Sequence, residues 1–526
     1  MAYSDSIKFD GKKYHSGVVQ LDGKEVAYRG FENIVYVKNP VLAQNQCMNI
    51  YVPEAYFNGG SVNGYTAKTA PVFFPNMIGG FMPSQPGVLR PKSEKTPSAI
   101  SYAILNGFVV ASPGARGRST MDQNKKYNGK APAAIVDLKA AVRYLRYNKK
   151  RIPGDMERII SNGTSAGGAF SALLGTSGNS RLYEPYLKEL GAAKERDDIF
   201  AASCYCPITN LEKASSAYEW QLKNVSEVSA IKVDMLDYKV QRKEEKGLLS
   251  DEQLELSKKL ASIFPDYVNS LNLIDKDGRL LSLDKDGNGS FKDYVKSFVL
   301  ESAKKEEAGG KDMSAYSFLK FKDGKIADLD FEGYVEYAGR MKTPGAFDAV
   351  DCTTGENNLF GDADNAKKYF TDFIYANRKA DYPLASPEIV YMMNAMNFIG
   401  KSGAVLDTGK SDENGKSGEA GKTSTSDGFS EGAAGKDAFT VADNASSNGK
   451  TRNNDKTGGN GADNAKHFRI RHGTRDRDTS LAIPVILATR LENCEIDTDF
   501  SLPWDRPHSG DYDLPELFAW INGIVK

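Results

Sequence analysis

The chain has 526 residues, of which 40% are hydrophobic and 26% charged, and its 68 basic residues balance 69 acidic ones. A chain of this length exceeds one ordinary domain and predicts a large domain that carries a smaller one. The balanced charge, with a pI near 6.5, produces no long-range field. This argues against a nucleic-acid partner and favours a small or neutral substrate.

The expected compartment follows from the first residues and from the cysteines. Residues 1–10 contain no apolar segment of the kind a secretory signal needs, and no stretch reaches the length of a transmembrane helix. The five cysteines are scattered and odd in number, which favours reduced thiols over a disulfide framework: Cys47, Cys204, Cys206, Cys352 and Cys494. We therefore expect a cytoplasmic protein with no membrane partner, and nothing in the sequence requires more than a monomer.

Short apolar runs alternate with amphipathic stretches in residues 1–205, which predicts a sheet wound with helices. The expected strands are Cys47–Val52, Val72–Phe74, Gly107–Ala111 and Arg158–Ser161. Ala131–Arg146 has apolar residues at helical spacing and should be a helix that lies on the sheet. Cys204 and Cys206 do not have the spacing of a zinc site, and we interpret them as two thiols on one face of a buried strand.

From about Pro207 the sequence changes to charged helical stretches. In Ser250–Phe264, Ser250 and Gln253 form a plausible capping box before an apolar face. We interpret residues 206–384 as an inserted lid domain, and residues 1–205 together with 385–526 as the catalytic domain. Near Ala385–Phe398 the chain becomes apolar again, which predicts its return to the main sheet.

Residues 401–465 are rich in Gly, Ser, Asp, Asn and Lys and contain few aromatic side chains. Such a segment buries too little apolar surface to offset the entropy of ordering, so we predict a disordered surface loop. The expected elements after it are a strand at Phe468–Arg471, a helix at Thr479–Leu491, a strand near Phe500 and a helix at Leu514–Ile524.

Gly163-Thr-Ser165-Ala-Gly167 matches the nucleophile elbow, in which small residues allow a tight strand-to-helix turn to present a serine hydroxyl. The motif alone is weak in a glycine-rich chain, and a plain Gly-rich turn would have the same letters. It follows an apolar strand and opens a helix of small residues, which is the context that the chemistry requires. The fold class predicted is therefore α/β: a doubly wound, mostly parallel sheet of the α/β-hydrolase type.

A serine nucleophile of this kind needs a histidine base and an orienting acid, which follow it in the order Ser, Asp, His. Of the four histidines, only His508 leaves room for an acid before it; the alternative is a surface histidine in a turn. We select Asp476, at the end of the preceding strand, as that acid. Asp478 is the rival, and one of the two acids could instead cap the following helix.

The oxyanion hole should combine the backbone N–H of Ala166 with an N–H from the loop after an early strand. Pro75-Asn-Met-Ile-Gly79-Gly80 lies in that place, and we select Gly79. The alternative is an ordinary loop.

Several longer motifs share a pattern with one family. They are Gly163-Thr-Ser-Ala-Gly-Gly168, Gly178-Asn-Ser180, Tyr183-Glu-Pro-Tyr186, Cys204-Tyr-Cys-Pro-Ile-Thr209, Arg469-Ile-Arg-His-Gly-Thr474, Asp478-Thr-Ser-Leu-Ala-Ile-Pro484 and Pro503-Trp-Asp-Arg-Pro-His508-Ser-Gly-Asp-Tyr-Asp513. Together they resemble the bacterial tannases of the shorter, non-secreted type, over most of the chain outside residues 401–465. That low-complexity segment is longer than expected for the family.

The resemblance implies a triad of Ser165, Asp476 and His508, and a galloyl pocket to which the lid contributes. It also implies that Lys342, Glu356 and Asp478 bind the ring hydroxyls of the galloyl group. An ammonium and two carboxylates supply the donors and acceptors that three adjacent phenols need. From the sequence alone, without the resemblance, a solvated pair on the lid is the favoured interpretation of Lys342 and Glu356.

A calcium site is a weak further candidate. Asp284, Asp286 and Asn288 begin like a calcium loop, but the twelfth position is Val295 instead of a glutamate. A hairpin turn explains the same residues, and Asp275-Lys-Asp-Gly278 shows that the chain uses such turns. No cofactor is otherwise expected.

The sequence therefore predicts a serine esterase that cleaves galloyl esters of tannins and simple gallates through an acyl-enzyme. Three alternatives stay open: a feruloyl or other carboxylic-ester hydrolase, a peptidase of the prolyl-oligopeptidase type, and a binding protein built on the hydrolase fold. The last would usually have lost its nucleophile or histidine, and here all three triad residues are present.

Overall fold

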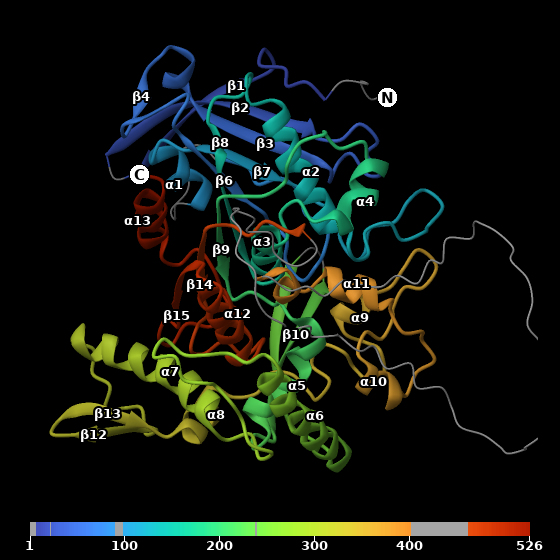
Figure 1. The fold of residues 1–526 in the computed structure, drawn as a ribbon, viewed down its shortest axis with the longest axis vertical. Coiled ribbons are helices and arrows are strands. Elements are labelled where there is room, and N and C mark those ends of the chain that lie inside the picture. The colour runs from blue at the N-terminus through green and yellow to red at the C-terminus, as the bar shows by residue number, and fades with distance from the viewer. Residues whose placement is uncertain (1–6, 22, 90–97, 237–238, 401–460) are drawn as a thin grey trace, which may run out of the picture.

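The computed structural model describes residues 7–21, 23–89, 98–236, 239–400 and 461–526. Its centre is a nine-stranded sheet in the order β1-β2-β3-β7-β6-β8-β9-β14-β15 (Figure 1). These strands are β1 (His15–Leu21), β2 (Lys24–Val35), β3 (Cys47–Pro53), β6 (Pro71–Pro75), β7 (Val109–Pro113), β8 (Asp155–Thr164), β9 (Ala201–Tyr205), β14 (His467–Arg471) and β15 (Asp497–Ser501).

The sheet has an antiparallel edge and a parallel remainder. β1, β2, β3 and β7 pair antiparallel, whereas β7, β6, β8, β9, β14 and β15 pair parallel. Parallel neighbours need crossover connections, which place helices on both faces of a sheet. The predicted doubly wound, mostly parallel α/β-hydrolase sheet is confirmed.

Two apolar clusters show which helices cover which face. The first joins the sheet to α2 (Ala133–Tyr147), α3 (Ala166–Thr176) and α12 (Ala482–Asn493). The second joins it to α1 (Ala99–Leu105) and α13 (Leu514–Ile524). β3, β6, β7 and β9 are buried at every position, as expected of strands covered on both faces.

The described residues between β9 and residue 400 gather on the side of the molecule away from β1, β2 and β3 (Figure 1). Its elements are α5 (Leu211–Leu222), β10 (Glu227–Leu236), β11 (Lys239–Leu248), α6 (Asp251–Ser270), α7 (Ser290–Ala308), β12 (Leu319–Lys322), β13 (Lys325–Leu329), α8 (Phe331–Ala338), α9 (Gly355–Leu359), α10 (Asp372–Ala376), α11 (Pro387–Met392) and η3 (Ala395–Phe398). The elements from α5 to α10 lie within residues 206–384, which we interpret as a lid, and the role of this region stays a prediction.

The remaining elements are short. They are η1 (Glu54–Phe57), β4 (Ser61–Val62), β5 (Tyr65–Thr66), η2 (Arg181–Tyr183) and α4 (Glu184–Glu189). No helix in the described part of the chain combines the length and hydrophobicity needed to cross a lipid bilayer.

Most of the elements expected from the sequence are present with shifted ends. The capping box before α6 is confirmed, since the Ser250 hydroxyl accepts the N–H of Gln253 and the Gln253 side chain accepts the N–H of Ser250. Neither Asp476 nor Asp478 caps α12, whose N-cap is Leu481. The hairpins β10–β11 and β12–β13 were not expected, because the charged residues around them favoured helices.

Three expectations need correction. Cys204 lies in β9 and Cys206 lies beyond its end with φ of 35°, so the two thiols belong to opposite clusters instead of one face. Residues 385–398 form α11 and η3, of which η3 packs against α3, and in the described part of the chain the next strand of the sheet is β14. Of the predicted loop, residues 401–460 lie outside the described residues. Residues 461–465 are packed, with Ala462 and Ala465 buried.

Candidate active site

Ser165 occupies a strained turn between β8 and α3. Its φ of 61° and ψ of −123° lie in a region that residues with side chains rarely adopt. A side chain at Gly163 would lie 2.3 Å from the Gly167 oxygen, and one at Gly168 would lie 2.5 Å from the Tyr205 oxygen. The small residues of the motif are therefore required by the close packing of the turn, and they hold the serine at the carboxyl end of the sheet.

Asn76, which the sequence analysis did not select, supports this turn. Its buried side-chain amide donates to the carbonyls of Asn162 and Gly167 at 3.2 and 3.0 Å, and to the Ser171 hydroxyl at 3.1 Å. An amide that bonds both the strand and the helix fixes the angle between them. Asn76 follows β6, so the loop after that strand both supports the elbow and leads to Gly79.

His508 lies in the loop between β15 and α13, and that loop passes beside the serine turn. A side chain at Gly510 would lie 1.9 Å from the Thr164 hydroxyl. The Asn162 amide also donates to Asp511 at 3.0 Å. These contacts hold the histidine loop against the end of β8, next to Ser165.

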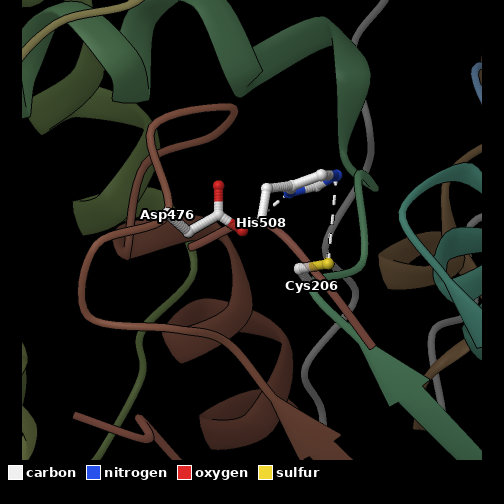
Figure 2. Close-up of side chains that lie close together, drawn as sticks. All are labelled: Cys206, Asp476 and His508. Carbon is white, nitrogen blue, oxygen red and sulfur yellow. Dashed lines mark hydrogen bonds and ion pairs between the residues drawn. The ribbon is translucent and has the colours of Figure 1, made fainter. Parts of the chain in front are cut away.

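Asp476 orients His508 (Figure 2). Its Oδ2 lies 2.7 Å from Nδ1 of His508, whereas the nearest Asp478 oxygen is 3.7 Å from the same nitrogen. The Asp476 side chain is fully buried and its Oδ1 accepts the N–H of Asp478 at 2.8 Å. The geometry therefore favours Asp476 over Asp478 as the acid.

The charges of this pair reinforce each other. Burial disfavours the imidazolium, but the Asp476 carboxylate outweighs that effect and raises the pKa of His508. Burial also disfavours the carboxylate, but His472 and His508 lower the pKa of Asp476 below its usual value. A carboxylate that stays ionised stabilises the imidazolium that forms when histidine accepts a proton.

Two further residues hold the acid loop and were not selected from the sequence. His472 is fully buried, with Nδ1 3.6 Å from Oδ2 of Asp476. The hydroxyl of Tyr334, in α8, donates to the carbonyl of Thr474. In the sequence, both residues have the pattern of ordinary core residues, so no signal distinguishes them from residues without a role at the site.

Cys206 lies against the other ring nitrogen of His508. Its Sγ is 3.9 Å from Nε2 and 3.4 Å from the Ser509 carbonyl, and burial raises the pKa of the thiol. Within the described part of the chain, Cys206, Asp476 and His508 form a group close enough to hold a metal ion. Because Nδ1 is already paired with Asp476, only Nε2 and the sulfur face a common point, fewer ligands than zinc sites use.

Of the two proposed oxyanion donors, Ala166 directly follows Ser165, and Gly79 belongs to a loop that packs on the elbow, where a side chain at Gly167 would lie 2.8 Å from the Ile78 oxygen. Ala166 is the first residue of α3, where backbone N–H groups are free and the helix dipole favours negative charge. Gly79 lies in the loop after β6, and a side chain there would meet nothing within 4 Å. The loop is folded by a hydrogen bond of 2.9 Å from the Met82 N–H to the Gly79 carbonyl.

Lys342, Glu356 and Asp478 lie together beside the triad. The Lys342 ammonium is 3.4 Å from Oδ1 of Asp478 and 4.1 Å from the centre of the Phe347 ring. Burial raises the pKa of Glu356, against the lowering effect of Lys342 and Arg118. Asp478 thus connects His508 on one side to Lys342 on the other.

A cavity of about 770 Å³ opens at Lys342 and Glu356. Its lining also includes Leu256, Met341 and Ala346, so it combines apolar surface with ionised groups. This volume and this combination are typical of a site for a small organic ligand.

The turns considered for calcium are closed by their own hydrogen bonds. Oδ1 of Asp284 accepts the N–H groups of Asp286 and Asn288, both at 2.9 Å, and Asp275 makes the same pair of bonds in its turn. The Asn288 side-chain oxygen accepts from Lys292 at 3.0 Å. These bonds account for the residues, and calcium binding stays an untested expectation.

Comparisons with known proteins address the fold and the family of the chain. Residues 91–263 match the family described as BD-FAE. The structure of a tannase from Fusobacterium nucleatum is 42% identical with a TM-score of 0.84, and the match covers 99% of this chain and 100% of that one. The chain belongs to the tannase family. The predictions of a tannase fold and of carboxylic ester hydrolase activity are thereby confirmed.

Two other structures of this family match at similar levels. A tannase from Lactobacillus plantarum is 39% identical, with a TM-score of 0.84 and coverage of 99% of this chain and 100% of that one. A tannin acyl hydrolase in complex with ethyl gallate is 39% identical, with a TM-score of 0.82 and coverage of 99% of each chain. A comparison with curated proteins gave no match.

Proposed function

We propose that Ser165, His508 and Asp476 hydrolyse galloyl esters and that Lys342, Glu356 and Asp478 bind the galloyl ring. The observation that carries this proposal is the continuous line of contacts from Asp476 to His508, Asp478 and Lys342. These contacts support the proposal that a phenol-binding cluster lies beside the serine hydrolase centre. The ethyl gallate complex of a related tannin acyl hydrolase supports the choice of acyl group.

The proposed reaction proceeds in two halves. Nε2 of His508 accepts the Ser165 proton while the serine oxygen bonds to the ester carbonyl carbon, and the N–H groups of Ala166 and Gly79 stabilise the oxyanion. The imidazolium then gives its proton to the departing alkoxide, which leaves as the alcohol. A water molecule, deprotonated by the same histidine, attacks the galloyl-enzyme and releases gallic acid and Ser165.

The pocket accounts for selection of gallate by its charges. Lys342 can donate to phenolic oxygens, and the carboxylates of Glu356 and Asp478 can accept from phenolic O–H groups. A ring without hydroxyls would leave these partly buried groups unpaired, which discriminates against it by up to ~10⁴-fold. The same chemistry suits simple gallates and the outer galloyl groups of tannins.

The test is the hydrolysis of methyl gallate, methyl ferulate and methyl benzoate by the protein and by Ser165→Ala. Ser509→Ala is a matched control, since Ser509 directly follows His508 in the chain and its exposed hydroxyl donates to the Pro507 carbonyl at 3.1 Å. We expect strong activity on gallate alone, lost in Ser165→Ala and kept in Ser509→Ala. Better activity on ferulate or benzoate would overturn the galloyl assignment. Inactivity on all three esters would instead favour a peptidase or a binding protein.

A further inference from the structure

Arg118 extends from a rigid part of the backbone. The neighbouring Arg116 guanidinium pairs with the fully buried Asp137 carboxylate at 2.8 Å, and the Arg116 N–H donates to the same carboxylate at 2.8 Å. Ala115 exchanges two backbone hydrogen bonds with Ser84, at 2.9 and 3.1 Å. The origin of the Arg118 side chain is therefore fixed relative to the loop that contains Gly79.

One end of Arg118 holds the loop with the proposed oxyanion donor. Its backbone N–H donates to the Phe81 carbonyl at 2.9 Å, and its Nε donates to the Gly80 carbonyl at 2.8 Å. Gly80 and Phe81 have φ of 54° and 57°, a conformation that Phe81 adopts only under constraint. Two successive carbonyls of this strained loop are thus held by one arginine.

The other end of Arg118 lies against the proposed galloyl pocket. A side chain at Gly355 would lie 3.3 Å from both Cζ and Nη2 of the guanidinium. Gly355 opens α9 and directly precedes Glu356, whose pKa burial raises and the charges of Lys342 and Arg118 lower. Arg118 therefore fills the space between the oxyanion loop and the pocket residue on α9.

We propose that Arg118 is a positioning residue that joins the oxyanion loop to the segment carrying Glu356, and so sets the oxyanion donor relative to the bound acyl group. The planar guanidinium is suited to this role, because it donates to Gly80 along one edge while its other atoms pack on Gly355. The identity of the acyl pocket rests on the proposed function. The expected effect on kcat also rests on the proposed role of Gly79 as an oxyanion donor, whereas the contacts of Arg118 with Gly80, Phe81 and Gly355 do not.

The test measures kcat and KM of Arg118→Ala, Arg118→Lys, Gly355→Ala and the double variant, on methyl gallate and on p-nitrophenyl acetate. We expect Arg118→Ala to lower kcat on both esters by about 10- to 100-fold, less than the ~10²–10³-fold loss of an oxyanion donor itself. Arg118→Lys should not restore kcat, because an ammonium lacks the planar fork. Arg279→Ala, an exposed arginine in a distant turn, should match the unaltered protein.

Gly355→Ala tests whether Arg118 couples α9 to the oxyanion loop, and it does so without removing the arginine. The added methyl group must displace the guanidinium by a few tenths of an ångström, so kcat should fall about 2- to 5-fold in the native background. The same change should have no effect when Arg118 is already alanine. An unchanged kcat in Arg118→Ala, or equal effects of Gly355→Ala in both backgrounds, would overturn the proposal.

The two substrates separate this inference from the proposed function. If the unaltered protein cleaves p-nitrophenyl acetate but not methyl gallate, the galloyl assignment fails, and kcat on the acetate still tests Arg118. If Arg118→Ala does not fold, judged by circular dichroism, then Arg118→Lys and Gly355→Ala carry the measurement. A kcat within twofold of the native value in both of those variants would then overturn the inference.

Discussion

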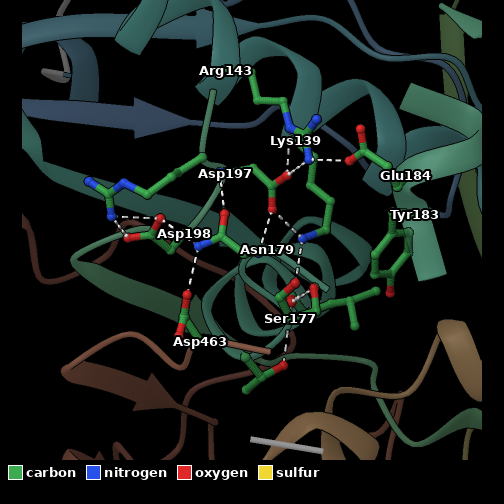
Figure 3. Close-up of polar contacts among 12 residues, drawn as sticks. Lys139, Arg143, Ser177, Asn179, Tyr183, Glu184, Asp197, Asp198 and Asp463 are labelled. Carbon is green, nitrogen blue, oxygen red and sulfur yellow. Dashed lines mark hydrogen bonds and ion pairs between the residues drawn. The ribbon is translucent and has the colours of Figure 1, made fainter. Parts of the chain in front are cut away.

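Buried ionisable groups lie at both ends of α3. They differ in how completely their hydrogen-bonding atoms are paired. At its C-terminal end, the Asp197 carboxylate lies between Lys139 and Arg143 (Figure 3). At its N-terminal end, Ser165 lies beside the pair of His508 and Asp476. We call the group of Asp197, Lys139 and Arg143 a closed network, because its charged groups are paired with one another. At the other end, the proposed nucleophile and base remain available to a substrate.

Every charge of the C-terminal network has several partners. Asp197 accepts from the Lys139 ammonium at 2.9 Å, the Arg143 Nε at 2.8 Å and the Asn179 N–H at 2.8 Å. The Lys139 ammonium also donates to the Ser177 carbonyl at 2.5 Å. In contrast, Nε2 of His508 lies 3.9 Å from the Cys206 sulfur, which is a weak contact. The difference shows that full satisfaction of buried charges fixes the helix, whereas incomplete satisfaction leaves a base free to react.

The largest expected effect comes from Asp476→Asn. The amide cannot hold the neutral histidine in the correct tautomer or stabilise the imidazolium, so kcat on methyl gallate should fall by about 10⁴-fold. Asp478→Asn, two residues away, is the matched control and should act mainly on KM. A larger fall of kcat for Asp478→Asn would make Asp478 the acid.

Mutation of the network at the C-terminal end of α3 should lower the stability of the protein instead of its activity. Asp197→Asn leaves two buried cations without their carboxylate and should lower the free energy of unfolding by about 3–5 kcal/mol. Thermal or urea unfolding measures this change. Asp198→Asn should cost less, because that carboxylate is 19% exposed and one of its partners, Arg196, is half exposed. Comparable losses in the two variants would contradict the closed-network interpretation.

The same carboxylate predicts a pH dependence. Burial raises the pKa of Asp197, but Lys139 and Arg143 outweigh burial and lower it below the usual 3.8. A depressed folded-state pKa contributes stability that is complete above the unfolded-state pKa and is lost as the pH falls through the folded-state pKa. Unfolding free energies measured on either side of pH 3.8 should therefore fall less steeply on acidification in Asp197→Asn than in the native protein.

Lys342→Met should lower activity on galloyl esters but not on p-nitrophenyl acetate. Loss of a charged hydrogen-bond donor costs about 1.5–3 kcal/mol, so kcat/KM for methyl gallate should fall roughly 10- to 150-fold. Lys259→Met is a matched control, since Lys259 lines the same cavity but is half exposed and pairs with Glu255. An equal fall for p-nitrophenyl acetate would show that Lys342 does not recognise the ring.

Cys206→Ala is expected to have the smallest effect. A sulfur 3.9 Å from Nε2 is at the limit of a weak contact, so kcat should change by about threefold or less. The measurement is again methyl gallate hydrolysis, together with loss of the thiol by mass spectrometry. Complete inactivity in a folded variant would mean that Cys206 takes part in the reaction and that the triad assignment is incomplete.

The sequence by itself determined those features of the protein that depend on a short stretch of residues. The elbow around Ser165, the capping box at Ser250 and the strands of continuous apolar residues all follow from short-range sterics and periodicity. The order of Ser, Asp and His narrowed the base to His508. The longer motifs identified the tannase family without any knowledge of contacts.

Only the tertiary structure decided between groups that the sequence leaves equivalent. Asp476 and Asp478 differ by two positions in one loop, and only the approach of His508, from beyond β15, distinguishes them. Cys206 was expected on the face of Cys204, but the turn after β9 rotates its thiol toward the histidine. Arg118 contacts Gly80 and Gly355, which lie far apart along the chain. Long-range contacts of this kind leave no periodic signal, because each depends on how separate segments pack against one another.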